Sequence, residues 1–280
     1  MNARRFERLL LTGAGGALGA VLRPSLASLC QTLRVSDRVA LPKLERTEEM
    51  AIAALEDGPA VDALATDVDA IVHFGGTMVE SWDSILNANV IGMYNLYEAA
   101  RRHGVKRVVY ASSNHATGFY PTKQRIDPSD PVRPDCLYGV SKTWGESLSR
   151  LYFDRYGIET ACLRIGSAFP EPTSLRMLAT WISYGDLQRL VAACLTAPLV
   201  GHVILYGVSR NSAGFWHNGG AAHIGYEPLD SADDYRATLE RSMPPLDPSD
   251  DDALYQGGGF IRVEQVSDAR ISNSPSEIAR

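Results

Sequence analysis

The sequence has little that would suit an exported or membrane-bound protein. Its 280 residues include only four cysteines, Cys30, Cys136, Cys162 and Cys194, which lie far apart and form neither a Cys-x-x-Cys pair nor a zinc-ligand pattern. No apolar run approaches the ~20 residues that are needed to span a bilayer. The charged first eight residues lead into a short apolar segment instead of a signal peptide. We therefore expect a cytoplasmic protein that contacts no membrane.

Positive charge and clustered metal ligands are also scarce. The formal net charge is −6, and the sequence pI is about 5.5. Because nucleic-acid-binding proteins present a basic surface, we expect no nucleic-acid partner. The histidines show no paired ligand spacing and no attendant cysteines, so we expect no metal site. They are His73, His103, His115, His202, His217 and His223.

Apolar runs alternate with helical patterns through the first half of the chain. Hydrophobic residues make up 45% and charged residues 21% of the total, which is typical of globular proteins. The alternation predicts βαβ units and hence an α/β fold, a Rossmann-type doubly wound parallel sheet with helices on both faces. The expected strands are 9–11, 31–35, 50–54, 69–74, 106–112 and 159–165, and the expected helices are 17–29, 59–65, 82–103 and 138–156.

A glycine-rich loop, residues 12–19, follows the first expected strand and opens the first expected helix. Gly13 allows a tight turn, Gly16 lets the backbone approach a pyrophosphate, and Gly19 permits close packing of the helix on the sheet. Backbone N–H groups at the helix start would then meet the anion. Glycines alone can mark an ordinary turn, but their place after a strand favours dinucleotide binding. The loop residues concerned are Gly13, Gly15, Gly16, Ala17, Leu18 and Gly19.

Asp37 follows the last glycine of this loop by 18 residues, at the expected end of the second strand. An acidic residue at about this distance hydrogen-bonds the adenosine ribose and rejects a 2′-phosphate, which favours NAD over NADP. A solvated loop carboxylate is the alternative interpretation, and the neighbouring Arg34 and Arg38 keep NADP open. Contact with the cofactor is also expected where the fourth strand ends, at Phe74, Gly75 and Gly76.

Tyr138 and Lys142 stand four residues apart in an expected helix, which puts both side chains on one face. A free tyrosine has a pKa of ~10, so a role for Tyr138 as a base near neutral pH requires a nearby positive charge, which Lys142 supplies. Ser113 follows the strand 106–112, at the sheet edge where ligands bind, and can hold a reacting oxygen. An exposed tyrosine beside a solvated lysine is the alternative for the pair alone. The three residues together predict a catalytic set.

Short motifs from about residue 9 to residue 260 extend this pattern. They are Ser112-Ser113-Asn114-His115, Gly118-Phe119-Tyr120-Pro121, Leu137-Tyr138-Gly139-Val140-Ser141-Lys142, Arg164-Ile165-Gly166-Ser167, Arg176-Met177-Leu178, Thr180-Trp181 and Gln256-Gly257-Gly258. With the glycine loop, they resemble the bacterial uronate dehydrogenases, a family in the extended, epimerase-like branch of the short-chain dehydrogenase/reductase superfamily.

The resemblance implies oxidation of a hexuronate, glucuronate or galacturonate, at C1 to the aldarolactone, with NAD as the acceptor and NADH as a product. Tyr138, activated by Lys142, would remove the hydroxyl proton while Ser113 holds the oxygen. Arg176 would bind the sugar carboxylate through two hydrogen bonds, although a surface arginine is the alternative. The implied substrate contacts are Thr77, Ser113, Asn114, His115, Tyr138, Ser167 and Arg176, and further cofactor contacts are Leu55, Asn89, Lys142 and Ala168.

Two positions depart from the pattern of this family. Thr77 stands where the family usually has a serine, which preserves a hydroxyl. Ala54-Leu55 replaces an Asp-Leu pair, which removes an expected hydrogen bond to adenine unless Glu56 or Asp57 compensates.

The regular alternation weakens after Gly166, where prolines punctuate shorter elements. We expect an NAD-binding Rossmann domain over 1–166 and a small substrate-binding region over 167–266 that packs on the same domain. The polar segment 267–280 is expected to be a flexible tail. By analogy with the family, the helices 82–103 and 138–156 are expected to form the interface of a homo-oligomer.

Three alternatives stay open at this point. A nucleotide-sugar epimerase or dehydratase of the same superfamily would share the fold and the catalytic residues, but the chain after Gly166 lacks a basic cluster for a diphosphate. A non-catalytic NAD-binding regulator would not need Ser113, Tyr138 and Lys142 together. A related dehydrogenase would act on a neutral sugar.

Overall fold

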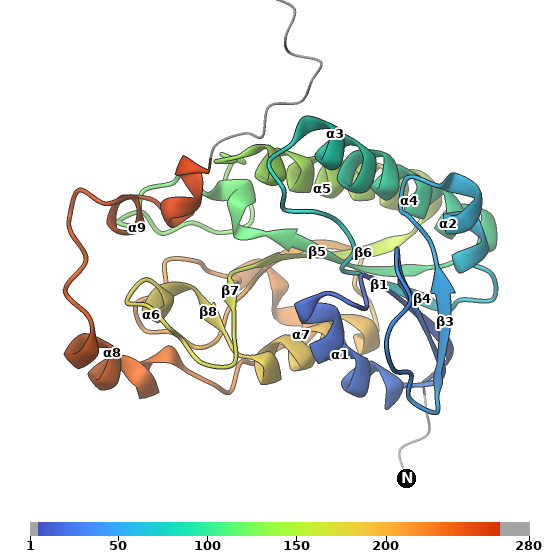
Figure 1. Cartoon of the computed structure of the whole chain (residues 1–280), viewed down its shortest axis with the longest axis horizontal. Coiled ribbons are helices and arrows are strands. Elements are labelled where there is room, and N and C mark those ends of the chain that lie inside the picture. The colour runs from blue at the N-terminus through green and yellow to red at the C-terminus, as the bar shows by residue number, and fades with distance from the viewer. Residues whose placement is uncertain (1–4, 264–280) are drawn as a thin grey trace, which may run out of the picture.

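The computed structural model describes residues 5–263 and builds them around one seven-stranded parallel sheet (Figure 1). The strand order is β3-β2-β1-β4-β5-β6-β9, so the chain winds outward on both sides of β1, and the expected doubly wound fold is confirmed. The strands are β1 Phe6–Thr12, β2 Cys30–Asp37, β3 Glu48–Ile52, β4 Ala70–His73, β5 Arg107–Ser113, β6 Glu159–Ile165 and β9 His202–Gly207.

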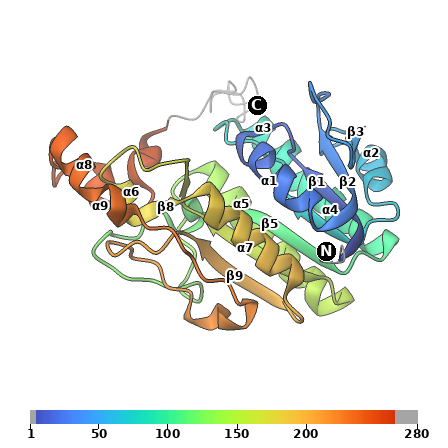
Figure 2. The same ribbon diagram turned by 90° about the horizontal axis from the view of Figure 1, so that it is seen from below.

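Helices cover both faces of the sheet (Figures 1 and 2). In β1, Leu9 and Leu11 belong to the core under α1 and α7, whereas Leu10 belongs to the core under α2, α4 and α5. All three leucines are fully buried, which explains why this strand is a continuous apolar run. Within the described residues, no helix is long and apolar enough to cross a membrane. The helices of these two layers are α1 Ala17–Ala27, α2 Gly58–Leu64, α3 Trp82–Ile85, α4 Gly92–His103, α5 Leu137–Tyr156 and α7 Tyr184–Thr196.

The helix expected over 82–103 is interrupted in the structure. A π-helical turn, Leu86–Ile91, separates α3 from α4 and turns Asn89 into the interior, where it is 6% exposed. Apolar periodicity does not reveal such a turn, because one extra residue leaves the helical pattern on either side intact. π-helical turns are common at functional sites, and this one faces α5.

The sheet also extends beyond the boundary expected at residue 166. After that point, α7 covers the face shared with α1, and β9 pairs in parallel with β6. The Rossmann sheet is therefore completed by a segment that was expected to belong to the substrate-binding region. The prolines after Gly166 made the sequence pattern of this final βαβ unit look irregular. The tail expected over 267–280 lies outside the described residues.

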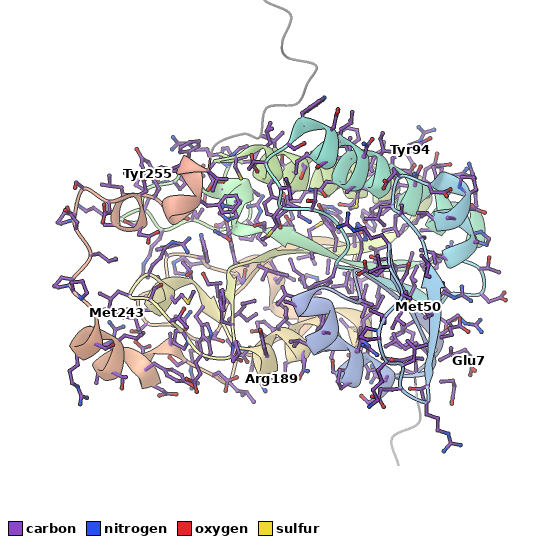
Figure 3. All side chains as sticks on the ribbon, viewed as in Figure 1. Glu7, Met50, Tyr94, Arg189, Met243 and Tyr255 are labelled. Atoms are coloured by element: carbon purple, nitrogen blue, oxygen red, sulfur yellow. The ribbon has the colours of Figure 1, made fainter. Side chains whose placement is uncertain are left out.

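Short elements gather at the end of the molecule opposite β3. Figure 3 shows Tyr255 at this end and Met50, on β3, at the other. We call residues 250–263 the C-terminal strap. Its backbone pairs with the loop after β5: Gln256 N–H donates to the Tyr120 carbonyl at 2.8 Å, and Gly257 N–H donates to the Gly118 carbonyl at 2.9 Å. The short elements are β7 Ser167–Ala168, α6 Met177–Thr180, β8 Trp181–Ile182, α8 Arg236–Ser242 and α9 Asp251–Leu254.

His73, at the end of β4, is expected to make the fold sensitive to acid. Burial, and then the charge of Lys142, lower its pKa from 6.5 to about 3, and Nδ1 lies 2.7 Å from the Thr12 hydroxyl. Below pH 6.5 the unfolded chain binds a proton that the folded chain refuses, so the free energy of unfolding falls as the pH falls. The expected loss between pH 6.5 and pH 5 is about 2 kcal/mol.

Urea unfolding at several pH values tests this expectation. His73→Asn keeps a polar side chain but removes the titrating group, so its free energy of unfolding should change less between pH 6.5 and pH 5 than that of the unaltered protein. His217→Asn, at an exposed position, serves as the control. Equal slopes for His73→Asn and the unaltered protein would contradict the prediction.

Candidate active site

The glycine loop joins β1 to α1 under tight steric constraints. Gly13 has a φ of +70°, and a Cβ there would lie 2.6 Å from backbone atoms of Phe74 and Gly75. A Cβ on Gly19 would lie 2.1 Å from the Gly13 carbonyl oxygen. Only glycine fits at these two positions. The start of α1 has no side-chain cap, so its first N–H groups can bind an anion.

Asp37 ends β2 with its carboxylate against the glycine loop. Its Oδ2 accepts the Gly15 N–H at 2.9 Å, and its Oδ1 accepts the Arg38 N–H at 2.8 Å. Arg34 is committed elsewhere, because its Nε donates to Glu49 at 2.7 Å and its Nη1 donates to two backbone carbonyls. The side chain that faces the glycine loop is therefore the acidic Asp37, which suits a ribose diol better than a 2′-phosphate.

The segment after β3 carries the departure at Ala54-Leu55. Leu55 packs closely on two glycines: a Cβ on Gly92 would lie 2.5 Å from Leu55 Cβ, and a Cβ on Gly75 would lie 3.1 Å from its Cδ1. Asp57 caps α2 through a 3.1 Å bond from the Ala60 N–H. Its carboxylate is therefore already engaged, and Glu56 is exposed.

Asn89 holds the segment after β4 in place. Its Oδ1 accepts the Thr77 N–H at 2.8 Å, while its Nδ2 donates to the Thr77 carbonyl at 2.9 Å and to the Ser141 hydroxyl at 2.8 Å. Gly76 precedes this clamp with a φ of +144°, where a Cβ would lie 2.8 Å from Asn89 Oδ1. The π-helical turn thereby fixes Gly76 and Thr77 against α5.

Ser113, Tyr138 and Lys142 converge at the end of β5, and each is at most 9% exposed. The Ser113 side chain lies close enough to the Tyr138 phenol to lower its pKa. Lys142 Nζ donates to the Ala111 carbonyl at 2.8 Å and lies 5.2 Å from the centroid of the Tyr138 ring. One turn of α5 thus presents a phenol and an ammonium beside a hydroxyl from β5.

Burial dominates the acid–base properties of this trio. It raises the pKa of Tyr138 to about 12, although the Ser113 side chain acts in the opposite direction. Burial also lowers the pKa of Lys142 to about 8, against the attraction of Glu146. The spacing of Tyr138 and Lys142 predicts that the ammonium lowers the pKa of the phenol. In the protein alone, burial dominates, and the pKa of Tyr138 lies above its ordinary value.

Glu80 is a buried carboxylate that the sequence analysis missed. It is 3% exposed, and its two oxygens accept the N–H groups of Leu137 and Tyr138 at 2.9 and 2.8 Å. The carboxylate therefore caps the first turn of α5, where a negative charge is favourable. No short motif marks it, because it lies 57 and 58 residues from its partners.

A buried ion pair lies beneath the same helix and was also missed. Arg164 on β6 makes two 2.9 Å hydrogen bonds to Glu146, which is one turn beyond Lys142 on α5. Glu146 also accepts the Ser112 hydroxyl at 2.7 Å, and Arg164 donates to the Tyr206 hydroxyl at 3.2 Å. Both charges are satisfied in the interior, so the pair ties α5 to three strands of the sheet.

Arg176, which the family resemblance assigns to the substrate carboxylate, lies beside β7. Its Nη2 donates to the Gln256 carbonyl at 2.5 Å, and Nη1 lies 3.4 Å from the Ser167 hydroxyl. Nε is buried without a hydrogen-bond partner, 3.8 Å from Asp252. Burial lowers the pKa of Arg176. Ala168, which follows Ser167 in β7, is half buried and packs against the core.

The C-terminal strap connects Arg176 to the candidate trio of Ser113, Tyr138 and Lys142. Gly258 has a φ of +66° and leaves no room for a side chain, since a Cβ would lie 2.4 Å from Arg176 Nε. Two residues later, the Phe260 ring lies 4.4 Å from the His115 ring and 6.5 Å from the Tyr138 ring, measured between centroids. Arg176 and the residues around Tyr138 therefore lie along the same strap.

Asn114 and His115 follow β5 directly, and Asn114 is 6% exposed. His115 lies 6.0 Å from the Tyr138 ring, between centroids. Folding also places ligand atoms of His115, Asp135 and Cys136 within 4.8 Å of one another. The sequence did not reveal this group, because Asp135 and Cys136 come from the loop before α5. His115 Nδ1 lies 2.9 Å from Asp135 Oδ2, and the Cys136 thiol accepts the Gly139 N–H at 3.2 Å.

These features fit a dinucleotide. The bare glycine backbone and the uncapped start of α1 offer N–H groups for a pyrophosphate, and Asp37 offers oxygens for a ribose. The clamped segment at Gly76 and Thr77 leads from this end of the site toward Tyr138.

Comparison with known proteins agrees with this arrangement. Residues 9–185 match the NAD dependent epimerase/dehydratase family. The chain is 50% identical to a uronate dehydrogenase from Pseudomonas putida over 93% of this chain and 97% of that one. A solved uronate dehydrogenase from Agrobacterium tumefaciens is 45% identical and matches with a TM-score of 0.92 over 94% of this chain and all of that one. A variant of it complexed with NAD gives a TM-score of 0.91 at the same identity and coverage.

Proposed function

Because the chain belongs to the NAD dependent epimerase/dehydratase family and matches uronate dehydrogenases over nearly its whole length, we propose that it oxidises a hexuronate at C1. NAD is the acceptor, and the products are the aldarolactone and NADH. The observation that carries the proposal is the position of Arg176: its side chain is only 15% exposed and lies against Gly258 of the strap, which also carries Phe260 beside Tyr138.

Tyr138 is the proposed base in this reaction. Its phenolate takes the proton of the anomeric hydroxyl, while the Ser113 hydroxyl, which lies beside the phenol, holds the sugar oxygen in line. When bound, NAD supplies the oxidant that accepts the C1 hydride, and its cationic ring adds a charge that favours phenolate. The Lys142 ammonium, anchored on the Ala111 carbonyl, supports the same anion. The carbonyl forms on a ring carbon, so the product is a lactone.

Arg176 is the proposed anchor of the substrate carboxylate. Its Nε has no hydrogen-bond partner, and burial has lowered its pKa, so an incoming carboxylate would satisfy a cation that the protein compensates incompletely. We also propose that Ser167, beside Arg176, His115, beside Tyr138, and the side chains of Thr77 and Asn114 bind the sugar hydroxyls. Thr77 offers its hydroxyl in place of the serine of the family.

We further infer a homo-oligomer that acts in the cytoplasm. α4 and α5 expose large apolar side chains: Tyr94 is 50% exposed, Val140 49%, Trp144 42% and Leu151 46%. Figure 3 shows Tyr94 on the outer layer, away from the sheet. The three residues of α5 follow helical spacing and form one stripe that suits a second copy of the chain. Light scattering that gave a monomer at every concentration would contradict this inference.

The substrate assignment is tested with the purified protein, NAD and a panel of sugars. Glucuronate, galacturonate, the two corresponding neutral hexoses and nucleotide sugars are each incubated with the protein, and NADH is followed by absorbance. NADH should form rapidly with one or both uronates and far more slowly with the other sugars. Rapid NADH formation from neutral hexoses with none from uronates would refute the assignment.

A further inference from the structure

Asp135 forms a closely packed pair with His115 next to the proposed base. His115 Nδ1 lies 2.9 Å from Oδ2 and 3.1 Å from Oδ1 of Asp135. The Asp135 side chain is fully buried, and the His115 side chain is 15% exposed. A further bond, 3.3 Å from the Asp135 N–H to the His115 carbonyl, ties the two backbones together. The orientation of the imidazole relative to the carboxylate is therefore fixed.

Two glycines enclose the Asp135 carboxylate. A Cβ on Gly118 would lie 1.7 Å from Oδ2, and a Cβ on Gly257 would lie 1.8 Å from the same atom. Gly118 belongs to the loop after β5, and Gly257 belongs to the C-terminal strap, so two distant segments meet at this oxygen. The Cys136 thiol borders the carboxylate as well, and burial together with the charge of Asp135 raises the pKa of that thiol.

The chemistry of this contact determines which nitrogen of His115 carries hydrogen. An ionised carboxylate only accepts hydrogen bonds, so Nδ1 must donate to it. In a neutral imidazole, Nε2 on the opposite edge of the ring then has a lone pair and accepts hydrogen bonds. The His115 ring borders Tyr138 and Phe260, with centroids 6.0 and 4.4 Å away, so this ring lies beside the region assigned to the sugar.

We propose that Asp135 is a positioning residue, which holds His115 as the Nδ1–H tautomer so that Nε2 accepts a hydrogen bond from a sugar hydroxyl beside Tyr138. This inference rests on the proposed function for its substrate. Asp135 touches neither sugar nor cofactor and acts only through His115. Buried carboxylates that orient a histidine typically change activity when altered without changing the fold.

Asp135→Asn is the direct test, because an amide of the same shape can also donate to Nδ1 and so permits the opposite tautomer. We expect kcat/KM for the uronate to fall by about 10- to 100-fold, with NAD affinity unchanged. The ¹⁵N spectrum of histidine-labelled protein should show Nδ1–H for His115 in the unaltered protein and a shift toward Nε2–H in Asp135→Asn. His115→Gln identifies the His115 signals.

A double-mutant cycle separates positioning from general destabilisation. In His115→Gln, whose amide can still donate to the carboxylate, adding Asp135→Asn should cause almost no further loss of kcat/KM. Asp62→Asn is the matched control, since Asp62 pairs with His103 on the surface at 3.2 Å and should leave kcat/KM unchanged. Thermal unfolding confirms that each variant is folded.

Three results would overturn the proposal. The first is an unchanged kcat/KM in Asp135→Asn. The second is a loss of kcat/KM on adding Asp135→Asn that is as large in His115→Gln as in the unaltered protein. The third is a spectrum that shows His115 as the Nε2–H or doubly protonated form in the unaltered protein. Failure of the proposed function is distinguishable from these results. It would appear as absent uronate oxidation by the unaltered protein, whereas the spectrum is read without turnover.

Discussion

Replacing Tyr138 by phenylalanine should lower kcat for uronate oxidation by about 1000-fold or more while NAD binding stays within about twofold. The change removes the only atom proposed to take the anomeric proton, and general-base catalysis typically contributes 10²–10⁴-fold. The ring itself remains to pack beside His115 and Phe260. The rate is measured by NADH formation, and NAD binding is measured by calorimetry with the same preparation.

Tyr235→Phe provides a matched control for this variant. Tyr235 packs on Trp181, with ring centroids 5.7 Å apart, and is outside the proposed site, so turnover should be unaffected. Normal turnover by Tyr138→Phe would show that another group acts as the base. Loss of NAD binding in parallel with turnover would show instead that the phenol is needed to hold the cofactor.

Replacing Arg176 by methionine should lower kcat/KM for uronates by about 100- to 1000-fold, because a charge-assisted, desolvated contact is lost. Methionine retains an apolar stem of similar length but loses the hydrogen bond from Arg176 to the Gln256 carbonyl of the strap. The slow reaction with the corresponding neutral hexose should change little, since that sugar has no carboxylate. For Arg176→Lys, kcat/KM for uronates should lie between the values of the unaltered protein and of Arg176→Met, because lysine keeps the charge but lacks the planar guanidinium.

Arg236→Met is the control for removing an arginine. Arg236 pairs with Asp233 at 2.6 Å near the start of α8, and it also lies 3.2 Å from the Ser212 hydroxyl and 3.5 Å from Glu240. Its kcat/KM for uronates should equal that of the unaltered protein. A uniform loss by Arg176→Met toward charged and neutral sugars alike would refute the carboxylate role and point to a collapse of the strap.

The parts of the site that the sequence revealed are those encoded by local spacing. The glycine loop was recognisable because Gly13 and Gly19 must be bare within one strand-to-helix turn. Tyr138 and Lys142 were recognisable because four residues make one helical turn. The strands through β6 and their parallel, doubly wound arrangement could be predicted from the alternation of apolar and helical segments, since each crossover is local in the chain.

The remaining parts depend on contacts between distant segments. Glu80 caps α5 from 57 residues away, and Asp135 reaches His115 across 20 residues. Neither carboxylate stands in a motif, and each would look solvated in a linear sequence. The π-helical turn at Asn89 escaped notice for a different reason, because its residues are equally compatible with an α-helix.

The strap also affects how the site is assembled during synthesis. Gly13 lies near the start of the chain, whereas Gly257, which closes on Asp135, and Phe260, which covers His115, lie close to its end. A ribosome releases the start of a chain before its end, so the glycine loop and the sheet can form while the strap that covers the proposed sugar site is still inside the exit tunnel. A nascent chain in that state would be able to hold a dinucleotide before it could enclose a sugar.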